Sequence, residues 1–220
     1  MTSPNNLTRA EARERARLLR VETYHVELDL RDQSTGTTFA STSTLRFTCT
    51  EPGVSSFLDL TAPALRRAVL NGRELDVSTF DGNRLPLPDL AGDNELRVEA
   101  DCAYMRTGEG LHRFVDPVDS AVYLYTQFET FDAHRMYGCF DQPDLKAAFR
   151  FVVHALDDWT CVSNAVATRE GCTWTFAETP RMSTYITALV AGPYAEVHDS
   201  HHGIPLGLYC RRSLAEHLDA

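Results

Sequence analysis

The strongest constraint on this chain is a run of short stretches in which apolar and polar residues alternate. The stretch 21–30, VETYHVELDL, alternates with period two rather than 3.6, which is typical of a half-buried strand. Stretches of the same kind follow at 38–50, 55–63, 66–75, 83–88 and 94–104. Turn signals such as Pro52-Gly53 and Asp81-Gly82 separate them. Strands at this spacing with no helix between them predict antiparallel sheets, folded as a β-sandwich or a curved saddle.

The same rhythm returns later in the chain, and two short helices flank it. Further strands are predicted at 146–156, 160–171, 172–180 and 183–198, where Thr and Val are enriched. Near the start, Thr8 and Glu11 stand at the spacing of a capping box and good helix formers follow them. Ser213 and Glu216 repeat that spacing and predict the start of a second helix.

We therefore expect a mainly β fold of saddle-shaped antiparallel sheets or a β-sandwich, with a short N-terminal helix. The expected parts are a helical lead-in over 1–20, an all-β domain over 21–205, and the start of a connection to a further domain over 206–220. The hydrophobic content of 43% suits a globular core that needs no disulfide or metal to hold it.

Charge and composition exclude several classes of partner. The formal net charge is −10, from 21 basic and 31 acidic residues, which disfavours binding to nucleic acid or to an anionic membrane. A cationic partner, such as a protonated amine, suits this balance better. The sequence has neither a signal-peptide core nor an apolar run of about 18 residues, and its six cysteines include no C-x-x-C pair. We expect a soluble cytoplasmic protein.

Common catalytic motifs are missing from the sequence. It contains no H-E-x-x-H, G-x-S-x-G, P-loop or G-x-G-x-x-G pattern. His198, His201 and His202 cluster among turn formers, which favours a solvated loop over a metal site. The sequence therefore predicts no catalytic residue, no metal ligand and no cofactor within this chain.

The segment 125–144, YTQFETFDAHRMYGCFDQPD, combines polar and aromatic side chains unusually densely. If 123–129 is a strand, Gln127 and Glu129 face the same side and offer an amide and a carboxylate to an ammonium group. Alternatively, both simply point to water from an ordinary half-exposed strand. Arg135 is expected to pair with Asp132 or Asp141 and to help hold the loop.

The segment 126–151, TQFETFDAHRMYGCFDQPDLKAAFRF, resembles the N-terminal domain of the M1 zinc aminopeptidases. The family pattern is Gln-x-Glu or Gln-x-Gln, then Ala-Arg, then Cys-Phe-Asp-x-Pro-x-x-Lys-Ala-x-Phe. Other stretches agree, so the resemblance runs from about residue 10 to the end, in wording closest to actinobacterial members. Two departures stand out, because His134 occupies the usual place of the Arg in Ala-Arg and Gly138 stands where Pro is common.

The resemblance implies a division of labour between this chain and a missing catalytic domain. In the family, zinc is held by H-E-x-x-H and a downstream Glu, all of which lie beyond the equivalent of Ala220. The full-length enzyme would thus contain zinc, whereas this chain would be inactive alone. The implied role of Gln127 and Glu129 is substrate binding, with the acidic residue meeting the free α-amine at peptide N-termini.

Two other functions remain open from the residues alone. The chain could be a non-catalytic β-sandwich interaction module, since one fold hosts many functions. It could also be a glycosidase-like protein that uses Glu129 with Asp132 or Asp141. If the missing-domain interpretation is right, we expect an apolar docking patch drawn from six rings of the segment, those of Tyr123, Tyr125, Phe128, Phe131, Tyr137 and Phe140.

Overall fold

The computed structural model describes residues 6–33 and 36–218, and it confirms a mainly β fold with one short α-helix near the N-terminus. The helix, α1, spans Arg9–Leu18. The strands are β1 Leu19–Asp29, β2 Thr38–Cys49, β3 Ser56–Asp59, β4 Ala64–Leu70, β5 Arg73–Glu74, β6 Arg84–Leu87, β7 Asp93–Ala103, β8 Gly110–Val115, β9 Val122–Gln127, β10 Ala148–His154, β11 Thr160–Ser163, β12 Ala167–Glu170, β13 Thr173–Phe176, β14 Leu189–Gly192, β15 Tyr194–His201 and β16 Ile204–Arg211. Short 3-10 turns are η1 Val77–Thr79, η2 Ala133–Arg135, η3 Thr184–Ile186 and η4 Arg212–His217.

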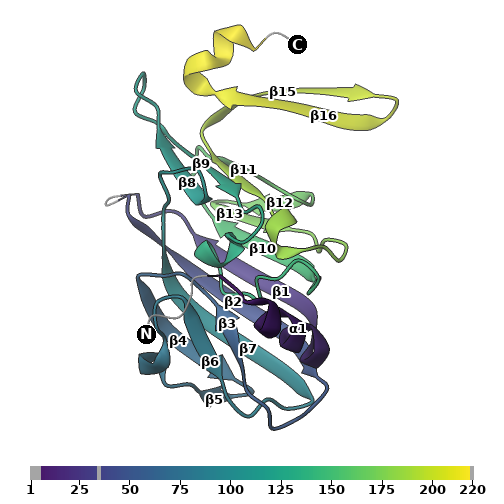
Figure 1. The fold of residues 1–220 in the computed structure, drawn as a ribbon. Helices are drawn as coiled ribbons and strands as arrows, with labels where there is room; N and C mark the ends of the chain where they lie inside the picture. The colour runs from purple at the N-terminus through teal and green to yellow at the C-terminus, as the bar shows by residue number, and fades with distance from the viewer. Residues whose placement is uncertain (1–5, 34–35, 219–220) are drawn as a thin grey trace.

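Most of the strands belong to two curved sheets (Figure 1). The larger sheet has the order β12-β13-β10-β1-β2-β7-β4-β5, and a four-stranded sheet has the order β11-β14-β9-β8. Neighbouring strands in both sheets are antiparallel, except that β1 and β10 run parallel, with Thr23 beside Ala148. The antiparallel prediction therefore holds for every pairing in these sheets but one.

Alternating burial along the strands explains why the period-two pattern was informative. In β7, Leu96, Val98 and Ala100 are buried on one face, while Glu95 and Arg97 are exposed on the other. Full burial of a Leu or Val side chain stabilises the fold by roughly 1.5–3 kcal/mol. The larger sheet thus has one wet face and one face that must be covered.

The aromatic segment 125–144 supplies part of that cover. Tyr137 is fully buried, and its ring lies 6.2 Å from that of Tyr24 on β1 and 5.9 Å from that of Phe151 on β10. Phe140 packs edge-on against Phe47 of β2 at 5.0 Å between ring centroids. These contacts fasten the segment onto the buried face of the larger sheet.

The predicted docking patch of six rings is therefore largely wrong. Four of its members, Tyr123, Phe128, Tyr137 and Phe140, are core residues with 2% or less of their surface exposed. Only Tyr125 is classed as exposed, and Phe131 is half-buried. The sequence shows that the segment is aromatic, but it does not show which strands lie beneath those rings.

Three strand predictions were too long. The stretch 66–75 covers most of β4, the turn at Asn71-Gly72 and β5. The stretch 160–171 contains two strands, β11 and β12, and 183–198 contains η3, β14 and most of β15. The hydroxyl of Ser213 does not cap an α-helix but lies within η4 and donates to Asp116 Oδ2 at 2.5 Å. Since Arg211 Nη1 also contacts that oxygen at 3.0 Å, Asp116 holds the end of the chain against the β8–β9 connection.

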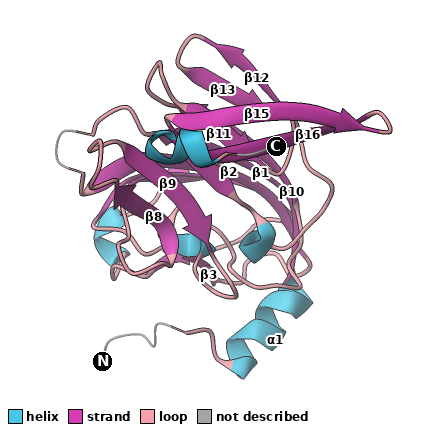
Figure 2. Cartoon of the chain, turned by 90° about the horizontal axis from the view of Figure 1, so that it is seen from above, coloured by secondary structure: helices cyan, strands magenta, loops and turns pink. Residues whose placement is uncertain are grey.

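The strands β15 and β16 form a hairpin that stands apart from the two sheets in Figure 1 and lies across them in the view from above (Figure 2). The predicted loop at His198, His201 and His202 is the distal part of this hairpin. Each residue from His198 to Tyr209 is exposed. In the part of the chain that the structure describes, no helix is both long enough and apolar enough to cross a membrane.

Helix α1 begins with the predicted capping box. The Glu11 amide donates to Thr8 Oγ1 at 3.3 Å, and the Thr8 amide donates to Glu11 Oε2 at 2.8 Å. Arg84 Nη1 reaches the other carboxylate oxygen at 2.7 Å. Burial alone would raise the pKa of Glu11, but the hydrogen bonds from Arg84 and Thr8 lower it to about 2.

Replacing Glu11 with Gln is expected to lower the free energy of unfolding at pH 7 by about 1 kcal/mol, because the ion pair with Arg84 is lost while the amide oxygen can still accept from Thr8. Because the folded-state pKa lies below the ordinary value of 4.5, this stabilisation is present above pH 4.5 and is lost as the pH falls towards 2. Denaturant titrations at pH 7 and pH 3 should show the difference between the two proteins shrinking. Glu22→Gln, at an exposed position of β1, is the control. A difference independent of pH would contradict the assignment.

Candidate functional site

The predicted amine-binding pair lies at the end of β9. The strand ends at Gln127, two residues earlier than predicted, and Glu129 belongs to the turn that follows. Both residues are exposed, whereas Phe128 between them is buried. Neither side chain makes a hydrogen bond or an ion pair to any residue in 6–33 or 36–218, so both remain free to meet a ligand.

The turn after β9 is closed by its own backbone and by one ion pair. The amide of Asp132 donates to the carbonyl of Phe128 at 3.2 Å. Arg135 Nε then donates to Asp132 Oδ1 at 2.6 Å, so Arg135 selects the first of its two predicted partners.

The other predicted partner, Asp141, is buried and is bound by different residues. His134 Nδ1 lies 2.7 Å from Asp141 Oδ2, which also accepts from the His134 amide at 3.2 Å. Thr184 donates its hydroxyl proton to Asp141 Oδ1 at 2.6 Å. With 1% of its surface exposed, Asp141 depends on these bonds because an unpaired buried carboxylate is costly.

A buried ion pair extends this network to α1. Arg15 Nη1 donates to Asp59 Oδ2 at 2.7 Å, and each side chain is only 3% exposed. The same Asp59 oxygen accepts from the amide of Asp141 at 2.9 Å. Burial raises the pKa of Asp59, although Arg15 and the Asp141 amide oppose that rise. Gln142 completes the link, accepting from Arg15 Nε at 3.3 Å and donating to the carbonyl of Ala12 at 2.9 Å.

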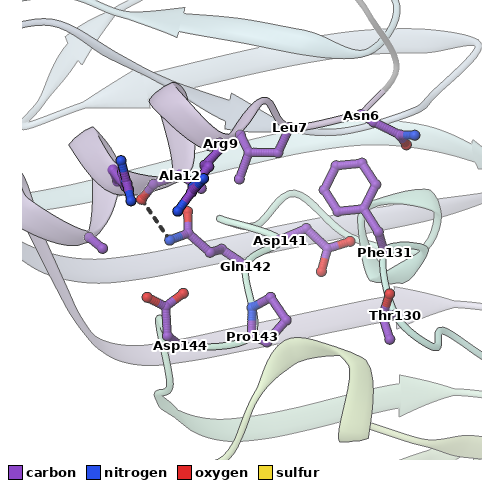
Figure 3. A pocket seen from close by; sticks show the side chains of 12 residues that line it. Asn6, Leu7, Arg9, Ala12, Thr130, Phe131, Asp141, Gln142, Pro143 and Asp144 are labelled. Carbon is purple, nitrogen blue, oxygen red and sulfur yellow. Dashed lines mark hydrogen bonds between the residues drawn. The ribbon is translucent and has the colours of Figure 1, made fainter.

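Two cavities flank this network. A cavity of about 680 Å³ lies between α1 and the segments 130–131 and 141–144 (Figure 3). A smaller one of about 260 Å³ lies beside the Glu129 turn and is lined by Thr130, Phe131, Asp132, His134 and Arg135, with Asn6, Thr61 and Asn83. Gln127 and Glu129 line neither cavity, although Thr130, which follows Glu129, lines both.

The described residues do not assemble other chemistry at this place. Among them, no group of three or more His, Cys, Asp or Glu side chains could hold a metal ion. The glycosidase hypothesis needs Asp132 or Asp141 as a free carboxyl partner for Glu129. Asp132 is instead paired with Arg135, and Asp141 is buried against His134 and Thr184.

Comparison with known proteins decides the family. Residues 91–186, which include β9, the Glu129 turn and the Asp141 network, match the peptidase M1 N-terminal domain. The chain belongs to the M1 peptidase family.

Several curated M1 relatives are similar to this N-terminal domain. Aminopeptidase N of Streptomyces lividans is 53% identical over 222 residues, which cover 98% of this chain and 26% of that protein. Aminopeptidase N of Acetobacter pasteurianus is 42% identical over 99 residues, 42% of this chain and 28% of that protein. Aminopeptidase M1 of Arabidopsis thaliana is 36% identical over 98 residues, 41% of this chain and 11% of that protein. The chain thus spans about a quarter of the Streptomyces relative.

The structure explains both departures from the M1 pattern. His134, which stands where an Arg is usual, contacts the buried Asp141 through its ring, while the following Arg135 pairs with Asp132. Gly138 is buried, and a β-carbon there would lie 2.8 Å from Leu58 Cδ2. A Pro at 138 would therefore require Leu58 to shift.

Sequence reasoning missed the pair of Arg15 and Asp59. In the sequence, Arg15 is one of several charged residues of a short surface helix, and no role is predicted for Asp59 within the predicted strand 55–63. The signal available in the sequence was weak: Leu18 and Leu19 follow Arg15 by three and four residues, the spacing of one helix face.

Replacing Arg15 with Ala is expected to lower the free energy of unfolding by about 3–5 kcal/mol, because Asp59 would be left as an uncompensated buried charge. Arg13→Ala, at an exposed position of the same helix, should change it by less than about 0.5 kcal/mol. Denaturant unfolding of the three proteins measures both values. Equal stabilities would show that the buried pair does not hold α1 to the domain.

Proposed function

We propose that this domain anchors substrate in a zinc aminopeptidase that removes N-terminal residues from peptides. Gln127 and Glu129 contact the free α-amine of the substrate. The observation that carries the proposal is that both side chains are exposed and unpaired. Gln127 ends β9 and Glu129 lies in the turn that follows, within the segment that matches the M1 domain.

The chemistry of the pair suits an ammonium group. A carboxylate accepts a charge-assisted hydrogen bond from an amine cation, and such bonds are about twice as strong as neutral ones. The amide oxygen of Gln127 offers a second acceptor without adding charge. Selection for a free amine follows, because a blocked N-terminus carries no cation for Glu129 to bind.

The reaction itself belongs to a part of the enzyme outside this chain. Zinc bound there would activate a water molecule for attack on the peptide bond. The residues described here would hold and orient the substrate N-terminus, and they would leave the proton transfers to that domain. A relative nearly four times as long as this chain has room for such a domain.

The β15–β16 hairpin supports a second domain as partner. One face carries Val197, Ile204, Leu206 and Leu208 beside Asp199 and His201, and Leu206 and Leu208 are 47% and 48% exposed. An isolated two-stranded hairpin is at best marginally stable in water. We infer that the catalytic domain covers this face. The same exposed face is what the competing interaction-module hypothesis would use for another protein.

The compartment proposed for the enzyme is the cytoplasm. All six cysteines are free thiols, and Cys49, Cys102, Cys139 and Cys161 are buried. Unpaired thiols of this number suit a reducing compartment.

The test of the substrate role uses a chimera in which this chain replaces the corresponding segment of the Streptomyces lividans aminopeptidase N. Glu129→Ala is expected to raise KM for an aminoacyl anilide about tenfold or more, since a hydrogen bond to a charged group contributes roughly 1.5–3 kcal/mol. Glu129→Gln should have a smaller effect, because an acceptor remains.

The matched control is Glu170→Gln on the exposed strand β12, which should leave KM and kcat unchanged. Unaltered kinetics in Glu129→Ala would refute the substrate role and would leave the interaction-module hypothesis as the better account.

The hairpin is tested with the double substitution Leu206→Asp and Leu208→Asp. In the chimera it should lower the temperature of inactivation by several degrees, because charges would be buried against the catalytic domain. In the isolated chain the same change should reduce binding of a hydrophobic dye and leave the unfolding midpoint unchanged. An equally stable chimera would rule out this face as the domain contact.

A further inference from the structure

We propose that the His134–Asp141 pair is a positioning device for the turn that carries Glu129, acting through the ring of Phe131. The effect on substrate rests on the function proposed above. The effect on the turn does not, because it concerns only contacts within this domain.

The Glu129 turn has two anchors, one at each end. At its start, Phe128 is buried, with its ring 6.4 Å from that of Tyr137. At its end, the ring of Phe131 packs on the imidazole of His134, with 4.5 Å between the centroids. Glu129 and Thr130 lie between these anchors and are exposed, so their position follows from the anchors rather than from contacts of their own.

The imidazole is itself held firmly in place. Its Nδ1 atom and the His134 amide both bind Asp141 Oδ2, at 2.7 and 3.2 Å. The His134 carbonyl accepts from the amide of Thr61 at 2.8 Å. Asp141 is fixed in turn by the Thr184 hydroxyl and by its own amide on Asp59. The ring therefore forms a rigid base beneath Phe131.

Few other contacts could hold the end of the turn. The ion pair of Arg135 with Asp132 is partly exposed, at 30% and 23% of the two side chains, and pairs of that kind contribute little. The closing bond from Asp132 to Phe128 is long, at 3.2 Å. Loss of the imidazole would thus loosen the end of the turn while Phe128 keeps its start in place.

A consequence for substrate follows from this asymmetry. If the end of the turn loosens, the Glu129 carboxylate samples many positions. Part of the free energy of binding the amine must then offset the entropy lost when this carboxylate is ordered. The reacting atoms are handled by a different domain, so binding should weaken while the chemical step keeps its rate. This split between KM and kcat distinguishes positioning from general loss of stability.

The variants distinguish the loss of the hydrogen-bond donor and of the ring from a change in side-chain volume. His134→Leu keeps most of the volume but removes both the donor to Asp141 and the planar surface under Phe131. His134→Arg restores a donor and a planar group. Phe131→Ala removes the ring contact and leaves Asp141 fully bonded. His25→Leu, at an exposed position of β1, is the control.

The first measurement is amide hydrogen exchange of the isolated chain, read residue by residue by NMR. In His134→Leu and Phe131→Ala, exchange at Asp132 and Arg135 should accelerate at least tenfold, while amides of β2 and β7 keep their protection. His134→Arg and His25→Leu should match the unmodified chain. If His134→Leu does not fold, Phe131→Ala carries the test alone. Unchanged exchange at Asp132 and Arg135 overturns the proposal.

The second measurement is the kinetics of the same variants in the Streptomyces chimera. His134→Leu and Phe131→Ala should raise KM about tenfold with kcat within twofold, and His134→Arg should restore KM. Faster exchange with an unchanged KM would mean that the position of the turn does not matter for substrate. That result would overturn the substrate half of this proposal and leave the structural half intact, whereas the role of Glu129 itself is decided by Glu129→Ala in the same chimera.

Discussion

The buried pair of Arg15 and Asp59 is the contact on which the arrangement of the site depends. It joins α1, β3 and the segment around Asp141, which lie far apart in the sequence. Two charges removed from water are stable only when their geometry and remaining hydrogen bonds are good. Asp59 meets that condition by also accepting from the Asp141 amide, and Gln142 serves Arg15 and α1 together. Because these buried groups must keep their hydrogen bonds, the segment around Asp141 can occupy few positions.

In the segment 125–144, aromatic and charged residues are mixed in the sequence but lie at different depths in the structure. Tyr137 and Phe140 point down into the core, Asp141 and His134 form a buried polar layer, and Glu129 stays at the surface. The dense mixture of aromatic and charged residues in 125–144 therefore reflects three layers, one above another. A single exposed turn is supported by the largely buried groups His134 and Asp141.

Much of the fold could be predicted from the sequence because burial alternates along the strands. The pattern in 21–30 and 94–104 is clear since each strand has one wet face and one dry face. The parallel pairing of β1 with β10 could not be predicted, because the residue pattern of a strand does not indicate which way its partner strand runs. For the same reason, the rings of 125–144 were expected at the surface: their partners Tyr24, Phe149 and Phe151 come from that distant pairing.

The parallel pairing also sets an order of assembly during synthesis. Residues 30–147 separate β1 from β10, so β1 has only β2 as a neighbour until β10 has emerged. At a rate of synthesis of about 5–20 residues per second, the other edge of β1 has no partner strand for roughly ten seconds. Tyr137 is made near the end of that interval and then lacks half of its packing surface for roughly one to three seconds, since Phe149 and Phe151 are on β10. The surface loop that carries Glu129 is therefore among the last parts of the domain to take shape, although it is made before the strand that fixes it.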